Sequence, residues 1–178
     1  MDLGLQGKVA LVTGASRGIG KAIALALGRE GASLVICARG EEQLREAEAQ
    51  LRSEGITVIA VPQDLTSNDA GMVLTSAAIS EFGKLDILVG SAGGNRRKPF
   101  EETSDDDWAS IMELNVLSHL RCARATIPAM RRAGGGAILF ISSIFGREGG
   151  GKGLSIYNTT KSALISAAKI MAMELAAD

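Results

Sequence analysis

The chain has 178 residues, of which 46% are hydrophobic and 22% are charged, and its formal net charge is −1. This length and composition predict a single globular domain, residues 1–178, with enough apolar residues for a substantial core. The near-zero charge, with both signs interspersed, excludes the basic surface that is typical of binding to nucleic acid or to anionic membranes.

Targeting signals are not recognisable in the sequence. The first ten residues lack the cationic and apolar regions of a secretory signal, and no apolar run approaches the ~20 residues needed to span a bilayer. The two cysteines, Cys37 and Cys122, lie far apart in apolar segments, which predicts buried free thiols. We therefore expect a soluble cytoplasmic protein.

Short apolar runs alternate with helical patterns along the whole chain. The runs predict five strands, at residues 8–14, 33–38, 56–61, 86–90 and 137–142. Helical spacing of apolar residues predicts helices that end near Gly31, pass through 44–51, and cover about 68–82, 105–132 and 155–178. Strands that are apolar on both faces and alternate with helices indicate an α/β fold, a doubly wound parallel sheet of the Rossmann type.

Two runs of charge flank the start of the long helix. Residues 96–98 are basic and residues 105–107 are acidic. We predict that each run is a solvated loop rather than a binding patch. No set of residues resembles a metal site.

A glycine-rich loop, TGASRGIG at residues 13–20, joins the first strand to the first helix. Glycines there allow a sharp turn and close approach to a ligand, and the helix N-terminus offers free N–H groups to a phosphate. Ala15 and Ala22 stand where a Walker A loop needs glycine and a hydroxyl residue, which excludes a P-loop. The spacing of Gly14, Gly18 and Gly20 also differs from the usual G-x-G-x-x-G fingerprint.

This G-x-x-x-G-x-G spacing resembles that of the short-chain dehydrogenase/reductase family, in particular the 3-oxoacyl-carrier-protein reductases. Further matches occur in the family's order: DLT at 64–66, SAGG at 91–94, LNV at 114–116, ISS at 141–143 and YNTTK at 157–161. The resemblance covers essentially the whole chain. It implies an oxidoreductase that interconverts a small-molecule ketone and a secondary alcohol with a nicotinamide cofactor.

Tyr157 and Lys161 stand four residues apart near the start of the last helix. Such pairs are common on amphipathic helices, and alone they indicate little. By the resemblance, Tyr157 is the general acid or base, and Lys161 also holds the nicotinamide ribose. A free phenol titrates near ~10, and a lysine cation one turn away stabilises the phenolate, which brings proton transfer within reach at neutral pH.

Three other polar residues need an interpretation. By the resemblance, Ser143 hydrogen-bonds the substrate oxygen; it is preferred to Ser142 because the residues after it match the family's Ser-x-x-Gly pattern. Asn115 is either a satisfied buried amide or, as the resemblance implies, a catalytic residue that bends the helix and anchors a water linked to Lys161. His119, alone on its helix, is expected to be structural.

The cofactor preference depends on the end of the second strand. Ala38 and Arg39 stand where an acidic residue would bind the ribose of NAD, and Arg17 lies in the glycine loop. Two guanidinium groups suit a 2′-phosphate, so NADP(H) is expected and NAD(H) is possible; alternatively, either arginine stacks on adenine or faces solvent. The resemblance implies that Asp64 and Leu65 contact the adenine. The whole cofactor set is Gly14, Ser16, Arg17, Gly18, Ile19, Gly20, Arg39, Asp64, Leu65, Ala92, Gly93, Tyr157 and Lys161.

Two departures from the family pattern matter. Gly90 and Ser91 replace an asparagine pair, so some side-chain bonding between strands is expected to be lost. The final strands and the substrate lid are expected to be absent, which would leave the fifth strand as an exposed edge. For this reason a second hypothesis stays open: a non-catalytic nucleotide-binding module or inactive fragment used in redox sensing or complex formation.

Family members commonly dimerise through the long helix and the final helix, and we expect a homo-oligomer, either a dimer or a tetramer. Both helices are rich in apolar residues that two-fold pairing could bury. The candidate interface residues are Trp108, Ile111, Leu117, Leu120, Leu164, Ile165, Met171 and Met173.

Overall fold

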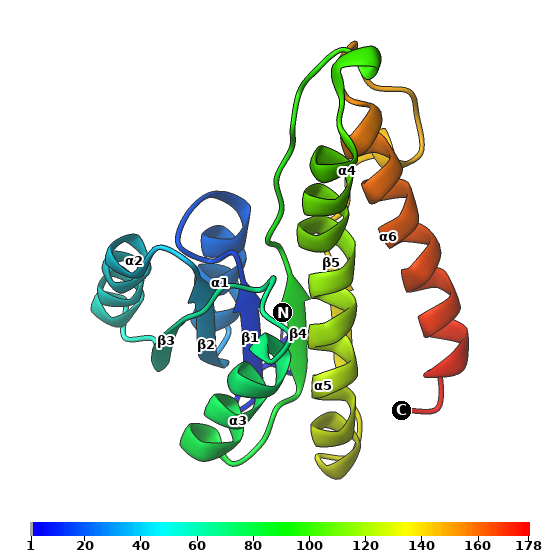
Figure 1. Ribbon diagram of the computed structural model, residues 1–178. Helices are drawn as coiled ribbons and strands as arrows, with labels where there is room; N and C mark the ends of the chain where they lie inside the picture. The colour runs from blue at the N-terminus through cyan, green and yellow to red at the C-terminus, as the bar shows by residue number, and fades with distance from the viewer. Residues whose placement is uncertain (1) are drawn as a thin grey trace.

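The protein is described by a computed structural model that covers residues 2–178. Its strands form one parallel sheet in the order β3-β2-β1-β4-β5 (Figure 1). The predicted α/β, doubly wound parallel sheet is confirmed. The strands are β1 (Val9–Thr13), β2 (Ser33–Ala38), β3 (Val58–Pro62), β4 (Ile87–Gly90) and β5 (Ala137–Phe140).

Helices connect the strands and cover both faces of the sheet (Figure 1). The long helix predicted for 105–132 is present, but a π-helical turn interrupts it. The helices are α1 (Gly18–Arg29), α2 (Glu41–Ser53), α3 (Ala70–Phe82), α4 (Asp105–Met112), the π-helical η2 (Glu113–Leu117), α5 (Ser118–Arg132) and α6 (Ser155–Glu174), with short 3₁₀ turns η1 (Phe100–Glu102) and η3 (Ile144–Gly146).

Two hydrophobic cores lie on the two faces of the sheet, because successive side chains of a strand point to opposite sides. In β1, Ala10 and Val12 belong to one core and Val9 and Leu11 to the other. The first core packs against α1 and α2, and the second against α3 and α5. This alternation explains why the strands are apolar at every position.

Four of the five predicted strands are shorter in the structure, and contacts with helices account for the start of β3 and the end of β5. Ile56 does not join β3, because its backbone N–H donates to the Leu51 carbonyl at the end of α2 and its side chain packs against Gly28 of α1. After β5 the chain turns away from the sheet at Ser142, whose hydroxyl donates to the Lys161 carbonyl in α6. Contacts with helices therefore determine where β3 begins and where β5 ends.

The edge of the sheet at β5 has one strand neighbour, β4. Leu139 in β5 is 49% exposed. The expectation that the fifth strand forms an edge is confirmed.

Both cysteines are buried free thiols, as predicted. Burial raises the pKa of Cys37 to about 12 and that of Cys122 to about 11, since a thiolate is poorly solvated inside the sheet layers. Neither thiol is therefore available as a nucleophile at neutral pH. Among residues 2–178, no helix is both long and apolar enough to cross a membrane.

Candidate functional site

A cleft of about 660 Å³ opens at the carboxyl ends of the strands. Ligands of open α/β sheets bind in this position, at the point where the strand order reverses. Here β1 lies between β2 and β4, so the chain leaves β1 toward one side and later returns on the other. The predicted residues that line the cleft are Gly14, Ser16, Arg17, Gly18, Ile19, Gly20, Arg39, Asp64, Leu65, Ala92, Gly93, Tyr157 and Lys161.

The glycine loop is packed so tightly that side chains are excluded at two of its positions. A Cβ atom on Gly14 would lie 2.8 Å from the Cα of Ala92, and Gly14 also has a φ of 65°. A Cβ atom on Gly20 would lie 2.4 Å from the Gly14 carbonyl oxygen. Real Cβ atoms do not approach so closely, so these glycines are needed for the loop to fold back on itself and for α1 to begin beside it.

Asn115 is fully buried in the π-helical turn η2, and its amide holds the loop after β4. Its Oδ1 accepts a hydrogen bond from the Gly94 N–H at 2.8 Å, and its Nδ2 donates to the Gly94 carbonyl at 2.9 Å and to Thr160 Oγ1 at 3.0 Å. The helix is therefore irregular at Asn115, where a π-helical turn replaces the α-helical pattern. π-Turns are frequent at functional sites because they insert a residue without breaking the helix.

Tyr157 and Lys161 lie on the first turns of α6, and both line the cleft. The Lys161 Nζ is 5.8 Å from the centre of the Tyr157 ring, and it donates to the Ile141 carbonyl at 2.8 Å. Lys161 is 5% exposed, and this burial lowers the pKa of its ammonium group. The structure thus brings the pair together at the same wall of the cleft.

The two serines after β5 have different partners. Ser142 lines the cleft, but its Oγ is engaged as a donor to the Lys161 carbonyl at 3.1 Å. Ser143 begins the short turn η3, and its Oγ accepts from the Phe145 N–H at 3.2 Å. The Ser143 hydroxyl therefore keeps its proton available for a ligand, although the residue is half-buried beside the cleft rather than part of its lining.

Arg17 and Arg39 face the cleft from the loops after β1 and β2. Among the described residues, neither forms an ion pair. Asp64, after β3, has a lowered pKa, chiefly because its carboxylate accepts hydrogen bonds from Thr66 and also because Arg39 is near. Two guanidinium groups and one carboxylate therefore share this end of the cleft.

Several residues of the cleft were not recognised in the sequence. Gln63 and Asn95 come directly after a strand and a recognised motif, so their position at the carboxyl edge could have indicated them. Gln43 lies inside α2 and carries no such signal. The lining residues that the sequence analysis did not assign to the site, some of them inside the quoted motifs, are Ala38, Gly40, Gln43, Gln63, Ser91, Gly94, Asn95, Leu114, Ile141 and Ser142.

At Gly90, other groups fill the space that a side chain would occupy. A Cβ atom there would lie 2.8 Å from Phe140 Cδ1 and 2.9 Å from His119 Nδ1. A tie between β1 and β4 remains, because Thr13 Oγ1 donates to the Val89 carbonyl at 3.3 Å and accepts from the Ser91 N–H at 3.1 Å. His119 is fully buried, as a structural residue should be, and its Nε2 lies 2.8 Å from the Ala92 carbonyl oxygen.

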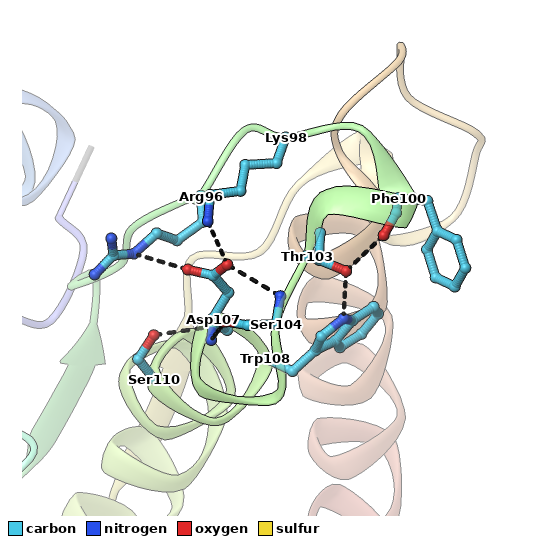
Figure 2. Close-up of polar contacts among 8 residues, drawn as sticks. All are labelled: Arg96, Lys98, Phe100, Thr103, Ser104, Asp107, Trp108 and Ser110. Carbon is cyan, nitrogen blue, oxygen red and sulfur yellow. Dashed lines mark hydrogen bonds and ion pairs between the residues drawn. The ribbon is translucent and has the colours of Figure 1, made fainter.

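The prediction of two solvated charge runs is wrong for Asp107, which is buried and binds Lys98 (Figure 2). Asp107 lies in the first turn of α4 with its side chain 8% exposed, and its Oδ2 accepts from Lys98 Nζ at 2.6 Å. The same carboxylate accepts from the Ser104 N–H, and the Ser104 hydroxyl accepts from the Asp107 N–H, which completes a capping box. The Nε atom of Arg96 lies 3.8 Å from Oδ1 of Asp107. Asp107, which was expected to lie in a solvated loop, thus anchors the segment between the cleft and α4.

Comparison with known proteins identifies the family. A family model described as "short chain dehydrogenase" matches residues 8–178. The chain belongs to this family. Among curated members, a tropinone reductase homologue of Arabidopsis thaliana is 38% identical over 175 residues, which are 98% of this chain and 66% of the relative. A 3-oxoacyl-[acyl-carrier-protein] reductase of Staphylococcus aureus is 34% identical over 170 residues, 95% of this chain and 69% of the relative.

Two solved structures that are similar to this chain have the same fold. The L-sorbose reductase of Gluconobacter frateurii, complexed with NADPH and L-sorbose, aligns with a TM-score of 0.94 and 39% identity over 98% of this chain and 66% of that chain. A 7α-hydroxysteroid dehydrogenase, complexed with NADH and 7-oxo glycochenodeoxycholic acid, aligns with a TM-score of 0.92 and 34% identity over 97% of this chain and 67% of that one. The chain spans about two thirds of the length of these proteins.

The Asp107 anchor predicts a pH dependence of stability. The hydrogen bond from Lys98 lowers the pKa of Asp107 from 3.8 to about 2. A carboxyl group with a lowered pKa stabilises the folded state above its unfolded pKa and loses that contribution as pH falls through the folded value. Asp107→Asn should therefore lower the free energy of unfolding at neutral pH, and the difference from wild type should shrink as pH falls from about 4 to about 2.

Urea unfolding at a series of pH values measures this difference. Asp105→Asn, in the same helical turn but exposed and without an ion pair, is the matched control and should show a much smaller gap. A gap that stays constant down to pH 2 would contradict the assigned role of Asp107.

Proposed function

We propose that this protein is an NADP(H)-dependent oxidoreductase that interconverts a ketone and a secondary alcohol, with Tyr157 as general acid or base. One observation carries the proposal: Tyr157 and Lys161 face the same cleft as the glycine loop of β1. Family membership and the two structural neighbours that hold NADPH and NADH support it.

The volume and the lining of the cleft support binding of a dinucleotide. Its volume of about 660 Å³ lies in the range of small-molecule and cofactor sites. Gly14, Gly18 and Gly20 leave the backbone open, and the N-terminus of α1 at Gly18 presents free N–H groups and a positive dipole end toward a pyrophosphate. The loop after β4, with Ala92 and Gly93, would lie along the nicotinamide half, and Asp64 and Leu65 would lie near the adenine.

A nicotinamide held in this cleft would supply the hydride transfer to or from the substrate carbon. Tyr157 moves the matching proton: in reduction its hydroxyl donates to the carbonyl oxygen, and in oxidation the phenolate takes the proton from the alcohol. Lys161 stabilises the phenolate because its cation is held near the ring in a buried place, where charges interact strongly.

Two further residues support the proton transfer. Ser143 donates a hydrogen bond to the substrate oxygen, which stabilises the charge that develops there. Asn115 acts by fixing the loop at Gly94 and, through Thr160, the first turns of α6. We also assign it the anchoring of a water that connects Lys161 with solvent. The π-turn at this residue is consistent with that role, since it alters the local pattern of backbone hydrogen bonds.

The preference for NADP(H) rests on charge. Arg39 comes directly after β2, where an acidic residue would bind the ribose of NAD, and Arg17 reaches the cleft from the glycine loop. Asp64 lies near Arg39, but among the described residues the two form no ion pair. A 2′-phosphate would find two guanidinium groups without carboxylate partners in ion-pair range. NAD(H) would bind more weakly, because it gains nothing from these charges.

The first prediction concerns Tyr157. Its phenolic oxygen has no hydrogen-bond partner among the described residues, so Tyr157→Phe removes the proton donor and little else. We expect turnover of a ketone substrate to fall by at least ~100-fold while NADPH affinity changes little. Steady-state kinetics and a fluorescence titration of NADPH measure the two effects. Near-normal turnover in the variant would refute the role of Tyr157, and NADPH binding without turnover in the wild type would favour a non-catalytic module.

The second prediction concerns the cofactor. Wild type should bind NADPH more tightly than NADH, and Arg39→Asp should reverse the order, because a carboxylate repels the phosphate and accepts the ribose hydroxyls. Arg39→Gln, which removes the charge without adding a carboxylate, should bring the two affinities close together. Titration by nucleotide fluorescence gives the affinity of each protein for each nucleotide. Equal affinities in the wild type would contradict the assignment of the arginines.

The third prediction concerns assembly, for which we propose a homo-oligomer through the long helical segment α4–η2–α5 and the final helix α6. Of the expected interface residues, Ile111 and Leu164 are buried in the subunit and cannot contribute, whereas Leu117 and Met173 remain exposed, as does Ile170. Leu117→Glu combined with Met173→Glu should dissociate the assembly. Light scattering at micromolar concentration measures its mass, and Met72→Glu, an exposed apolar position on α3, is the control. A monomeric wild type would exclude the oligomer.

A further inference from the structure

His119 is a buried polar residue that the proposed chemistry leaves without a task. It lies in the first turn of α5, has no exposed surface, and is the one histidine of the sequence. Its ring packs beside Phe140, with 5.6 Å between the ring centres. Burying a polar ring is unfavourable unless its nitrogens find partners, so the position of each nitrogen is informative.

The surroundings of the ring determine which nitrogen carries the proton. Nε2 lies 2.8 Å from the Ala92 carbonyl oxygen, which can only accept, whereas Nδ1 has no partner among the described residues. The neutral ring with the proton on Nε2 is the form that makes this bond. Burial and the nearby charge of Lys161 lower the pKa of His119 to about 4, so the ring is neutral at physiological pH.

The free nitrogen lies against Gly90. A Cβ atom on Gly90 would lie 2.9 Å from Nδ1 and 2.8 Å from the Phe140 ring, too close for either ring to stay in place. Any residue other than glycine at position 90 would therefore push the imidazole away from Ala92. Gly90 and His119 form a matched pair in which the missing side chain makes room for the ring.

The carbonyl that His119 holds belongs to the wall of the cleft. Ala92 lines the cleft, and its Cα lies against Gly14 of the glycine loop. Other groups fasten the rest of this loop: Thr13 binds the Ser91 N–H, and Asn115 binds both backbone groups of Gly94. Without His119, the carbonyl of Ala92 would lack this donor, and a part-buried carbonyl without a partner favours a rearranged backbone.

We propose that His119 is a positioning residue of the nucleotide cleft, whose Nε2–H fixes the Ala92 carbonyl and thereby the wall at Ala92 and Gly93. Gly90 contributes to the same arrangement, because the absence of a side chain there provides the space for the His119 ring. The inference rests on the proposed function only for the nature of the ligand, a nicotinamide dinucleotide. It adds a residue that shapes the site without contacting the ligand.

A pair of substitutions of nearly equal shape tests the hydrogen bond. Gln places an N–H₂ group where the imidazole has Nε2, and Met has the same length without a donor. His119→Met should weaken NADPH binding by about tenfold, the scale of one hydrogen bond, whereas His119→Gln should stay within about threefold of wild type. If His119 were only a filler of the core, the apolar Met would be tolerated at least as well as Gln. Equal or tighter binding by the Met variant would overturn the proposal.

A second measurement needs no nucleotide and separates this inference from the proposed function. Hydrogen exchange of the amides of residues 91–94 should be about tenfold faster in His119→Met than in His119→Gln, because the freed segment opens more often. Equal exchange rates in the two variants would refute the role of His119. If wild type bound no nicotinamide dinucleotide, the proposed function would fail, while the exchange rates would still decide the question of His119.

The protonation of the ring is a third check. Because the sequence has one histidine, ¹⁵N spectra of the imidazole are unambiguous. The proton should be found on Nε2 at neutral pH in the folded protein. A proton on Nδ1 would leave Nε2 unable to donate to Ala92 and would contradict the proposal.

Discussion

The close contact between the backbone after β1 and the backbone after β4 is the constraint on which the rest of the site depends. Gly14 lies against Ala92 with no room for a Cβ atom, and this contact occurs where the order of the parallel strands reverses. Ligands of open α/β sheets bind in the crevice at this point, outside the carboxyl ends of the strands, and here the residues on both sides of the contact line the cleft. The glycine loop, the cleft and the position of the ligand all depend on this approach.

One helical segment holds the loop after β4 in that position. Three polar residues along α4, η2 and α5 face the loop, and each binds a different part of it. Asp107 binds Lys98, Asn115 binds Gly94, and His119 binds Ala92. The π-helical turn η2 contains Asn115, the second of these three residues. A regular helix repeats every 3.6 residues, so an added residue changes which side chains lie on the face beside the loop.

The opposite wall of the cleft is fixed by a reciprocal tie between the end of β5 and α6. The Lys161 Nζ donates to the Ile141 carbonyl, and the Ser142 hydroxyl donates to the Lys161 carbonyl. These two bonds determine where Lys161 and its neighbour Tyr157 stand. In addition, α6 packs against η3, the turn that follows β5.

The sequence by itself determined the sheet, its parallel character and most of the cleft. Strands buried on both faces must be apolar at successive positions, and the glycine spacing and the Tyr157–Lys161 spacing are local patterns along one segment. The ends of β3 and β5 were less predictable, because helices compete with the sheet for the backbone groups there. Ser143 was selected from a local pattern; the structure adds that its proton is free and that the residue lies beside the cleft rather than in its lining.

Only the tertiary structure decided which polar residues hold the cleft in shape. Asp107 appeared to be one of three equivalent surface acids, and His119 a lone histidine, because their partners lie on other segments; Ala92 is 27 residues from His119. The role of Gly90 is invisible without the ring that fills its place. Periodicity reports which face of an element is buried, whereas the pairing of a buried polar atom depends on the distance between segments that only the folded chain brings together.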